Sequence, residues 1–303
     1  MDFKLLKTAG FWRSAWEEAL KNSLWAKRTK DSSDFWNKIA LTYGQERQTK
    51  EKDRLEAVME ILETQGILNK DSVVLDIGCG PGVYALRMAP KVKQVVALDS
   101  AEKMIEVLEE KAKEAGLPNI TTVVLPWEEV DLEKMGWSGY FDLVFASITP
   151  AIRDPETFLK MLAASRKYCC LIEFAGGYHN PVFAELWKLI FKEAYPGGGF
   201  EVIYPLNFLL ALGYLPSLRF IDDFWEEEKP AEEAIESLCA SFGRYTDVTP
   251  EIKQIISDYI QKQSKDGIYH QKVSHHLGVI LWEVNKKRIY PVGRQPDNWG
   301  QRG

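Results

Sequence analysis

The sequence lacks the features that would place it in several broad classes of protein. Its four cysteines form no Cys-x-x-Cys pair, which argues against a zinc site or a redox motif. It has no run of about 18 apolar residues, so no membrane-spanning helix is expected. The charged start of the chain has no apolar core, so no signal peptide is expected there. Unpaired thiols then indicate the reducing cytoplasm.

An excess of positive charge is also missing. The chain has 38 Lys and Arg against 44 Asp and Glu, for a net charge of −6. Nucleic acids are bound through clustered Lys and Arg, so no nucleic-acid partner is expected. The 303 residues are enough for one large α/β domain, or for a core with a smaller lid, without disulfide bonds. These properties argue against a nucleic-acid partner and against a membrane-spanning protein.

The middle of the chain alternates between apolar strands and helices. The expected strands cover residues 72–77, 95–98, 121–125, 141–146 and 168–174. The expected helices cover residues 83–89, 101–115 and 155–164. Continuous apolar strands separated by helices are typical of a parallel sheet covered on both faces.

The flanking segments are expected to be mainly helical. Helices are expected near residues 15–20, 34–43, 51–65, 181–194, 207–212, 231–242 and 250–264, with strands at 217–221 and 276–284. We therefore divide the chain into a helical N-terminal cap (1–70), a cofactor-binding core (71–177), the rest of the sheet with helical lid insertions (178–287) and a loose C-terminal tail (288–303).

A glycine turn follows the first expected strand, and three kinds of ligand compete for such a turn. A phosphate-binding P-loop requires a Lys-Ser or Lys-Thr pair that is absent here. A dinucleotide fingerprint requires a third glycine where this chain has Val83. Asp76, just before the turn, would repel a pyrophosphate but would suit a cationic ligand such as the amino group of a methionine moiety.

The turn also carries a family resemblance. Residues 73–82 read Val-Val-Leu-Asp-Ile-Gly-Cys-Gly-Pro-Gly, which resembles motif I (D-x-G-x-G-x-G) of class I, Rossmann-like S-adenosylmethionine-dependent methyltransferases. The resemblance implies an α/β fold of three layers, with a seven-stranded, mostly parallel sheet and an antiparallel last strand. It implies S-adenosylmethionine as cofactor and S-adenosylhomocysteine as product. No metal site is expected.

The resemblance and the strand pattern together give a set of cofactor-binding residues. Asp99 ends the second expected strand, where an acid commonly accepts hydrogen bonds from ribose hydroxyls. Ser100 is the expected cap of the next helix. Met104 would face the adenine or simply pack in the core. The turn contributes Asp76, Gly78, Cys79, Gly80, Pro81 and Gly82.

Further positions complete this set. Trp127 could stack on the base, and Glu128 could accept a hydrogen bond from its amino group. Ser147, at the end of the fourth expected strand, and Thr149 after it should face the reacting methyl group or the substrate. The helix ahead of motif I resembles one that closes over the cofactor, with Trp36 and Tyr43 as candidates.

The acceptor of the methyl group is less well defined. The segment from Ser147 to Pro150 lacks the two prolines that follow Asp, Asn or Ser in the signature of amino-methylating enzymes, which favours a small-molecule acceptor. Non-catalytic binding of the cofactor, and methylation of protein or RNA, remain alternatives. If a general base is needed, Glu173 and His179 are the candidates, followed by His275 and His276.

Overall fold

A computed structural model describes residues 4–23, 32–41, 51–176, 180–195 and 201–287. A single seven-stranded sheet forms its centre, in the order β3-β2-β1-β4-β5-β7-β6. The strands are β1 (Val73–Ile77), β2 (Gln94–Asp99), β3 (Ile120–Val124), β4 (Phe141–Ser147), β5 (Ser165–Phe174), β6 (Ser217–Pro230) and β7 (Ile268–Glu283). Strands β1 to β5 are parallel, and β7 runs antiparallel to both β5 and β6. The predicted mostly parallel sheet with an antiparallel last strand is confirmed.

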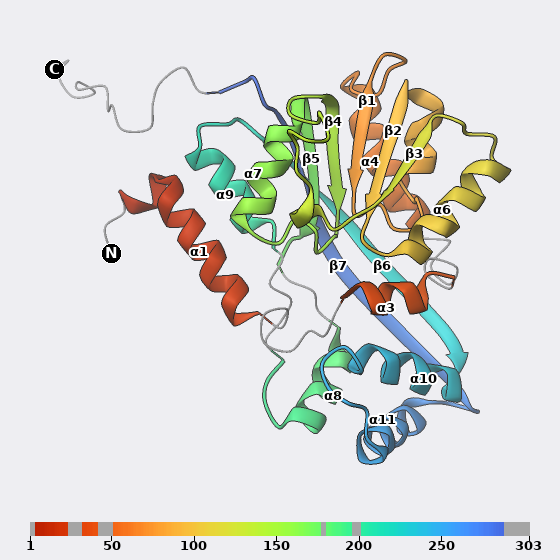
Figure 1. Cartoon of the computed structure of the whole chain (residues 1–303). Helices are drawn as coiled ribbons and strands as arrows, with labels where there is room; N and C mark the ends of the chain where they lie inside the picture. Colours follow the sequence, from red (N-terminus) through yellow and green to blue (C-terminus); the bar gives the residue numbers. More distant parts are fainter. Residues whose placement is uncertain (1–3, 24–31, 42–50, 177–179, 196–200, 288–303) are drawn as a thin grey trace.

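Helices cover both faces of this sheet and give the expected three layers (Figure 1). One face packs against α4 (Glu51–Thr64), α5 (Ala85–Met88) and α6 (Glu102–Glu114). The other face packs against α1 (Ala9–Asn22), α7 (Pro155–Ala164) and α9 (Ile203–Ala211). The short helix α3 (Ser32–Ile39) lies against α6. The N-terminal helices are thus distributed over both faces of the sheet.

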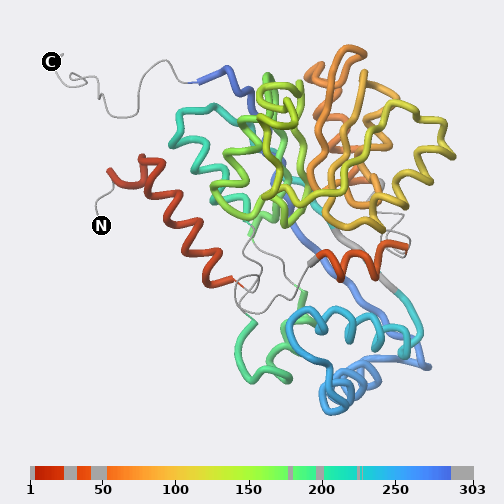
Figure 2. The backbone as a smooth tube through the Cα atoms, in the orientation of Figure 1, coloured from red at the N-terminus to blue at the C-terminus, as the bar shows by residue number. Residues whose placement is uncertain are grey.

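A separate group of helices lies beyond the carboxyl ends of the parallel strands (Figures 1 and 2). It consists of α8 (Pro181–Phe191), α10 (Ala231–Phe242) and α11 (Pro250–Gln263), with an apolar core of their own. The aromatic residues of α8 pack inside this core: Phe183 stacks on Phe242 with ring centroids 4.4 Å apart. This helical subdomain is carried by β6 and β7, which extend well beyond the other strands.

The length of β6 and β7 is the main departure from the expected elements. Strands were expected only over the apolar stretches 217–221 and 276–284, but the two strands pair in register from Ser217–Leu281 to Pro230–Ile268. The added segment of β7, residues 268–275, is largely polar and alternates between exposed and buried side chains. Strands of this kind are stabilised by backbone hydrogen bonds to the neighbouring strand and by burial of one face. A search for continuous apolar residues does not detect them.

Candidate functional site

The glycine turn connects β1 to α5 at the carboxyl edge of the sheet. Gly78, Gly80 and Gly82 have φ angles of +66°, +53° and +86°, which favour glycine. At Gly78 a Cβ atom would lie 2.0 Å from the Thr149 Oγ1 atom, so the loop after β4 packs directly on the turn. At Gly80 a Cβ atom would meet no atom within 4 Å. The backbone at Gly80 therefore has space beside it for a ligand.

The amide groups of the turn are already used inside the protein. Gly78 N and Cys79 N both donate to Leu98 O. Gly80 N donates to Asp99 Oδ2, and Gly82 N donates to Cys79 O. Pro81 has no amide hydrogen to donate. A pyrophosphate would thus find no free amide donor between residues 78 and 82. The Cys79 thiol is buried and burial raises its pKa, so the backbone of Cys79 is the part that can face a ligand.

Asp76 is buried in β1 directly before the turn. Its side chain is 2% exposed, and its Oδ2 atom has no hydrogen-bond partner among the described residues. Burial and then the neighbouring charge of Asp99 raise the pKa of Asp76 to about 7, against the opposing effect of the Ala85 amide. A buried carboxylate oxygen without a partner suits a cationic group that is supplied by a ligand.

Asp99 ends β2 as predicted, and it also supports the turn. Its Oδ1 atom accepts a hydrogen bond from Ala101 N at 2.9 Å, and its Oδ2 atom accepts one from Gly80 N at 2.9 Å. Burial raises its pKa, although these amides act in the opposite direction. The expectation that Ser100 caps the next helix is wrong: Ala101 is the N-cap residue of α6, and Asp99 provides the side-chain acceptor.

Helix α3 lies over the start of α6, where a closing helix was expected. Met104 is 2% exposed and packs with Ala40 and Ala101, with Trp36 beside them. The Asn37 Oδ1 atom accepts a hydrogen bond from Lys103 N at 3.0 Å. Packing of Met104 is therefore established, whereas its contact with adenine stays a prediction. Tyr43 lies outside the described residues.

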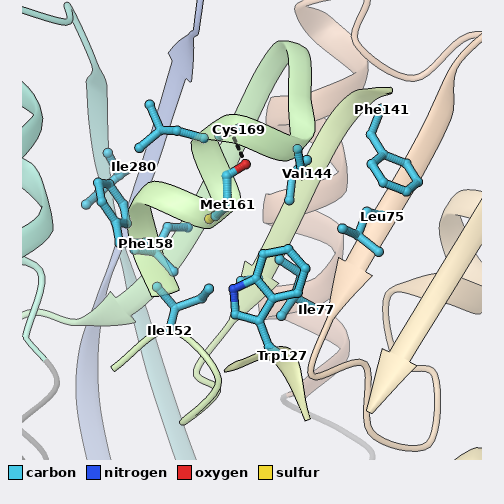
Figure 3. Packing of buried hydrophobic residues seen from close by; sticks show 14 of the residues in the cluster. Leu75, Ile77, Trp127, Phe141, Val144, Ile152, Phe158, Met161, Cys169 and Ile280 are labelled. Atoms are coloured by element: carbon cyan, nitrogen blue, oxygen red, sulfur yellow. Dashed lines mark hydrogen bonds between the residues drawn. The ribbon is translucent and has the colours of Figure 1, made fainter. Parts of the chain in front are cut away.

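Trp127 and Glu128 are placed differently from the expectation. The indole of Trp127 is 1% exposed and lies in the core among Ile77, Val144 and Ile152 (Figure 3). Its Nε1 atom donates to Thr157 O at 3.0 Å. Both faces of the ring are thus enclosed by protein, which argues against stacking on a base. Glu128 lies at the surface and pairs with Arg153 at 3.1 Å.

The ends of β4 and β5 provide the remaining candidates. Ser147 is half-buried at the end of β4, and Ile148 after it has a left-handed φ of +47°, which turns the chain sharply toward Thr149. Glu173 in β5 is 3% exposed, and its Oε1 atom has no hydrogen-bond partner among the described residues. Burial raises its pKa well above the usual value, and the backbone hydrogen bond with Phe174 acts in the opposite direction. Its role as a general base stays a prediction. His179 lies outside the described residues.

Two side chains at this edge were not singled out in the sequence. Asn37 joins α3 to α6, and the guanidinium of Arg244, after α10, lies 4.4 Å from the ring centroid of Phe35 and 5.7 Å from that of Trp36. Helix α3 therefore contacts both the sheet domain and the helical subdomain. An arginine and aromatic residues about 200 positions apart in the sequence give no local signal of such a contact.

Two other observations concern ions and membranes. Within the described ranges, no three His, Cys, Asp or Glu side chains are grouped as metal ligands. In the same part of the chain, no helix combines the length and apolar character needed to span a bilayer.

The residues at this edge fit S-adenosylmethionine. Asp76 offers a buried oxygen to an ammonium group, Gly80 leaves room beside its backbone, and Asp99 stands at the end of β2. The strand order and the carboxyl-edge site define the class I, Rossmann-like methyltransferase fold.

Comparison with known proteins gives the family. Residues 74–168 match the methyltransferase domain family, so this part of the chain is a methyltransferase domain of the S-adenosylmethionine-dependent type. S-adenosylmethionine is its cofactor. The match covers motif I and the strands through the start of β5.

Individual relatives resemble larger or smaller parts of the chain. An uncharacterised protein of Haemophilus influenzae is 26% identical over 231 residues, which cover 71% of this chain and 78% of that protein. A protein arginine N-methyltransferase 1 of Oryza sativa is 30% identical over 122 residues, covering 37% of this chain and 31% of that protein. A crystal structure of a candidate methyltransferase from Bacillus halodurans has a TM-score of 0.51 at 20% identity, covering 76% of this chain and 98% of that one, and supports the fold alone.

Proposed function

We propose that this methyltransferase acts on a small-molecule acceptor. The observation that carries the proposal is the acidic helical subdomain, which β6 and β7 hold beyond the carboxyl edge of the sheet (Figure 1). Residues 222–276 contain twelve Asp and Glu against six Lys and Arg. A surface of this charge disfavours RNA, while its position suits a cover over a small acceptor.

The cofactor would be held by three groups of residues. Asp76, in its ionised form, would bind the ammonium group, and Asp99 would accept hydrogen bonds from the ribose. The backbone from Gly78 to Gly82 would pass beside the methionine portion, with α3 covering the nucleoside over Met104. Bound S-adenosylmethionine supplies an electrophilic methyl group on a sulfonium ion. The protein's task is then to hold the acceptor in line with that methyl group.

Ser147 would face the acceptor side of the site, because its register with Ile172 puts it on the face of the sheet that carries Asp76. Glu173, next along β5, points to the opposite face, where its buried Oε1 atom has no hydrogen-bond partner among the described residues. We also propose a cytoplasmic location, because all four cysteines are free.

The test follows a labelled methyl group into three pools of acceptor. The purified protein is incubated with S-adenosylmethionine labelled at the methyl group and with a low-molecular-mass metabolite fraction, bulk RNA or a protein extract from one cell lysate. We expect label in the metabolite fraction. Label in RNA or protein alone would contradict the proposal, as would binding of S-adenosylhomocysteine without any transfer.

A further inference from the structure

A belt of buried polar side chains lies on the β6–β7 extension, between the sheet and the helical subdomain. Nearer the sheet, Leu277 and Val279 of β7 belong to an apolar core, and nearer the helices Tyr269 belongs to another. Between them the same face of β7 carries two buried polar residues, His275 and Gln271, with the buried Val273 between them. The belt consists of Arg54, Asp223, Gln271 and His275.

The members of this belt are positioned by neighbouring elements. The Arg54 Nη1 atom, from α4, lies 3.0 Å from the Asp223 Oδ2 atom, and both side chains are largely buried. Asp223 of β6 is in register with His275 of β7. The Gln271 Nε2 atom donates to Asn180 Oδ1, which caps α8. Buried polar groups between two apolar cores cost stability, and such groups are concentrated where chemistry requires them.

The register of the sheet places His275 on the same face as Asp76. Asp76 pairs with Phe145 of β4, and side chains alternate between faces along each strand. Phe145 pairs with Cys170 of β5, so Cys170 and every second residue after it, up to Phe174, lie on this face. Phe174 pairs with Leu277 of β7, and His275 lies on the same face because it is two residues from Leu277. The His275 ring meets the Phe174 ring edge-on, at 5.5 Å between centroids. His275 therefore stands next to the carboxyl end of β5, where parallel sheets bind their substrates.

We propose that the belt is the acceptor site and that His275 is the proton acceptor of the methyl transfer. This inference rests on the function proposed above and specifies the acceptor as a small molecule whose nucleophile, a hydroxyl or a thiol, carries a proton. The nucleophilic atom forms its bond to the methyl carbon, and the sulfonium sulfur keeps the electron pair of the broken S–C bond. His275 takes the proton and returns it to solvent. Asp223, held by Arg54, favours the imidazolium that forms.

The adjacent residue provides a matched control. His276 has the same side chain one position along β7, but it points to the opposite face. There it is 70% exposed and its Nδ1 atom lies 2.7 Å from the Asp222 Oδ1 atom. His275→Asn and His276→Asn each remove one imidazole, from opposite faces of the same strand.

The first experiment compares His275→Asn with His276→Asn. The substrates are methyl-labelled S-adenosylmethionine and the low-molecular-mass metabolite fraction. We expect His275→Asn to lose about 100-fold or more in turnover with its affinity for S-adenosylhomocysteine within about twofold. His276→Asn should keep both. Free imidazole should partly restore His275→Ala. Wild-type turnover in His275→Asn, or equal losses in both variants, would overturn the proposal.

The second experiment does not depend on the acceptor or on the folding of a variant. The ring pKa of each histidine is measured by NMR in wild-type protein saturated with S-adenosylmethionine or with S-adenosylhomocysteine. The sulfonium charge should lower the pKa of His275 by about half a unit or more, and leave His276 unchanged. Equal His275 values in the two complexes would overturn the inference even if small molecules are methylated. A difference at His275 combined with label found only in RNA or protein would refute the proposed acceptor class and keep the placement of His275.

Discussion

Two carboxylates are buried at opposite ends of the same sheet, and their surroundings differ in one respect. Asp142 lies at the amino end of β4. It accepts hydrogen bonds from Val73 N at 2.9 Å and from the Arg166 Nε and Nη2 atoms at 2.9 and 2.6 Å. Asp76 lies at the carboxyl end of β1, and its Oδ2 atom has no partner among the described residues. Both side chains are nearly inaccessible to solvent.

The pKa shifts of the two groups are opposite. Burial acts to raise the pKa of Asp142, but the bonds from Arg166 and Val73 lower it below its usual value. Burial and Asp99 raise the pKa of Asp76 to about 7. Burial also raises the pKa of Asp99 and Glu173 at the carboxyl edge. The amino end of the sheet therefore satisfies its buried charge with protein groups, while the carboxyl end leaves buried acids for a ligand to satisfy.

The largest effect is expected for Asp76→Asn. The variant should bind S-adenosylhomocysteine about 100-fold more weakly, or about 3 kcal/mol, because a charge-assisted contact with the ligand's ammonium group is lost. Its free energy of unfolding without cofactor at pH 8 should not fall below that of the wild type, because the neutral amide removes a buried charge. Calorimetry and urea denaturation measure the two quantities. Unchanged affinity would show that Asp76 does not contact the cofactor.

The converse is expected for Asp142→Ala. This variant should lose about 2–3 kcal/mol of unfolding free energy, because Val73 N loses its acceptor and Arg166 loses its partner. Its affinity for S-adenosylhomocysteine, measured where it is folded, should remain near that of the wild type. Denaturation and calorimetry on the same samples check both statements. A loss of affinity comparable to that of Asp76→Asn would remove the distinction between the two ends of the sheet.

Asp99→Ala should lose both cofactor affinity and stability, whereas each of the two variants above should lose mainly one of them. The cofactor affinity should decrease by roughly 1–3 kcal/mol, since a ribose would lose its acceptor. A loss of stability should accompany it, because Gly80 N and Ala101 N also lose their acceptor. Asp99→Asn, which keeps one acceptor oxygen, is the control and should retain more stability than affinity. Equal recovery of both quantities in Asp99→Asn would assign Asp99 a purely structural role.

The sequence predicts the core of the fold well, because strand and helix periodicity is local information. The helices α7 and α10 have the expected bounds, and each of the first five strands lies where an apolar run was found. The extension of β6 and β7 was missed, because polar alternating strands such as residues 268–275 resemble a loop in composition. Only pairing between strands separated by two helices stabilises them.

The candidate site was predictable where it is encoded in consecutive residues. The turn from Asp76 to Gly82 is continuous in the sequence, and its glycines adopt the expected left-handed angles. Trp127 was expected to stack on the adenine because an aromatic side chain after a strand is suited to stacking. Its burial depends on contact with α7, some 30 residues later, which the local sequence does not reveal. The belt around His275 joins α4, β6 and β7 across more than 200 residues, so no local pattern could reveal it.

The smallest effect concerns pH, and it tests the difference between the two carboxylates without removing either. Because Asp76 has a folded pKa near 7, above its unfolded value of 3.8, the folded state holds a proton that the unfolded state has lost between these values. The stabilisation is complete below about pH 4, falls as pH rises toward the folded pKa of Asp76, and is lost above about pH 7. Asp99 and Glu173 act with the same sign, so the difference between wild type and Asp76→Asn isolates Asp76. Binding of the cofactor's ammonium group should lower this pKa and release a fraction of a proton near pH 6.5, detectable by calorimetry in buffers of different ionisation enthalpy. No proton release in the wild type, or the same release in Asp76→Asn, would show that the ligand does not ionise Asp76.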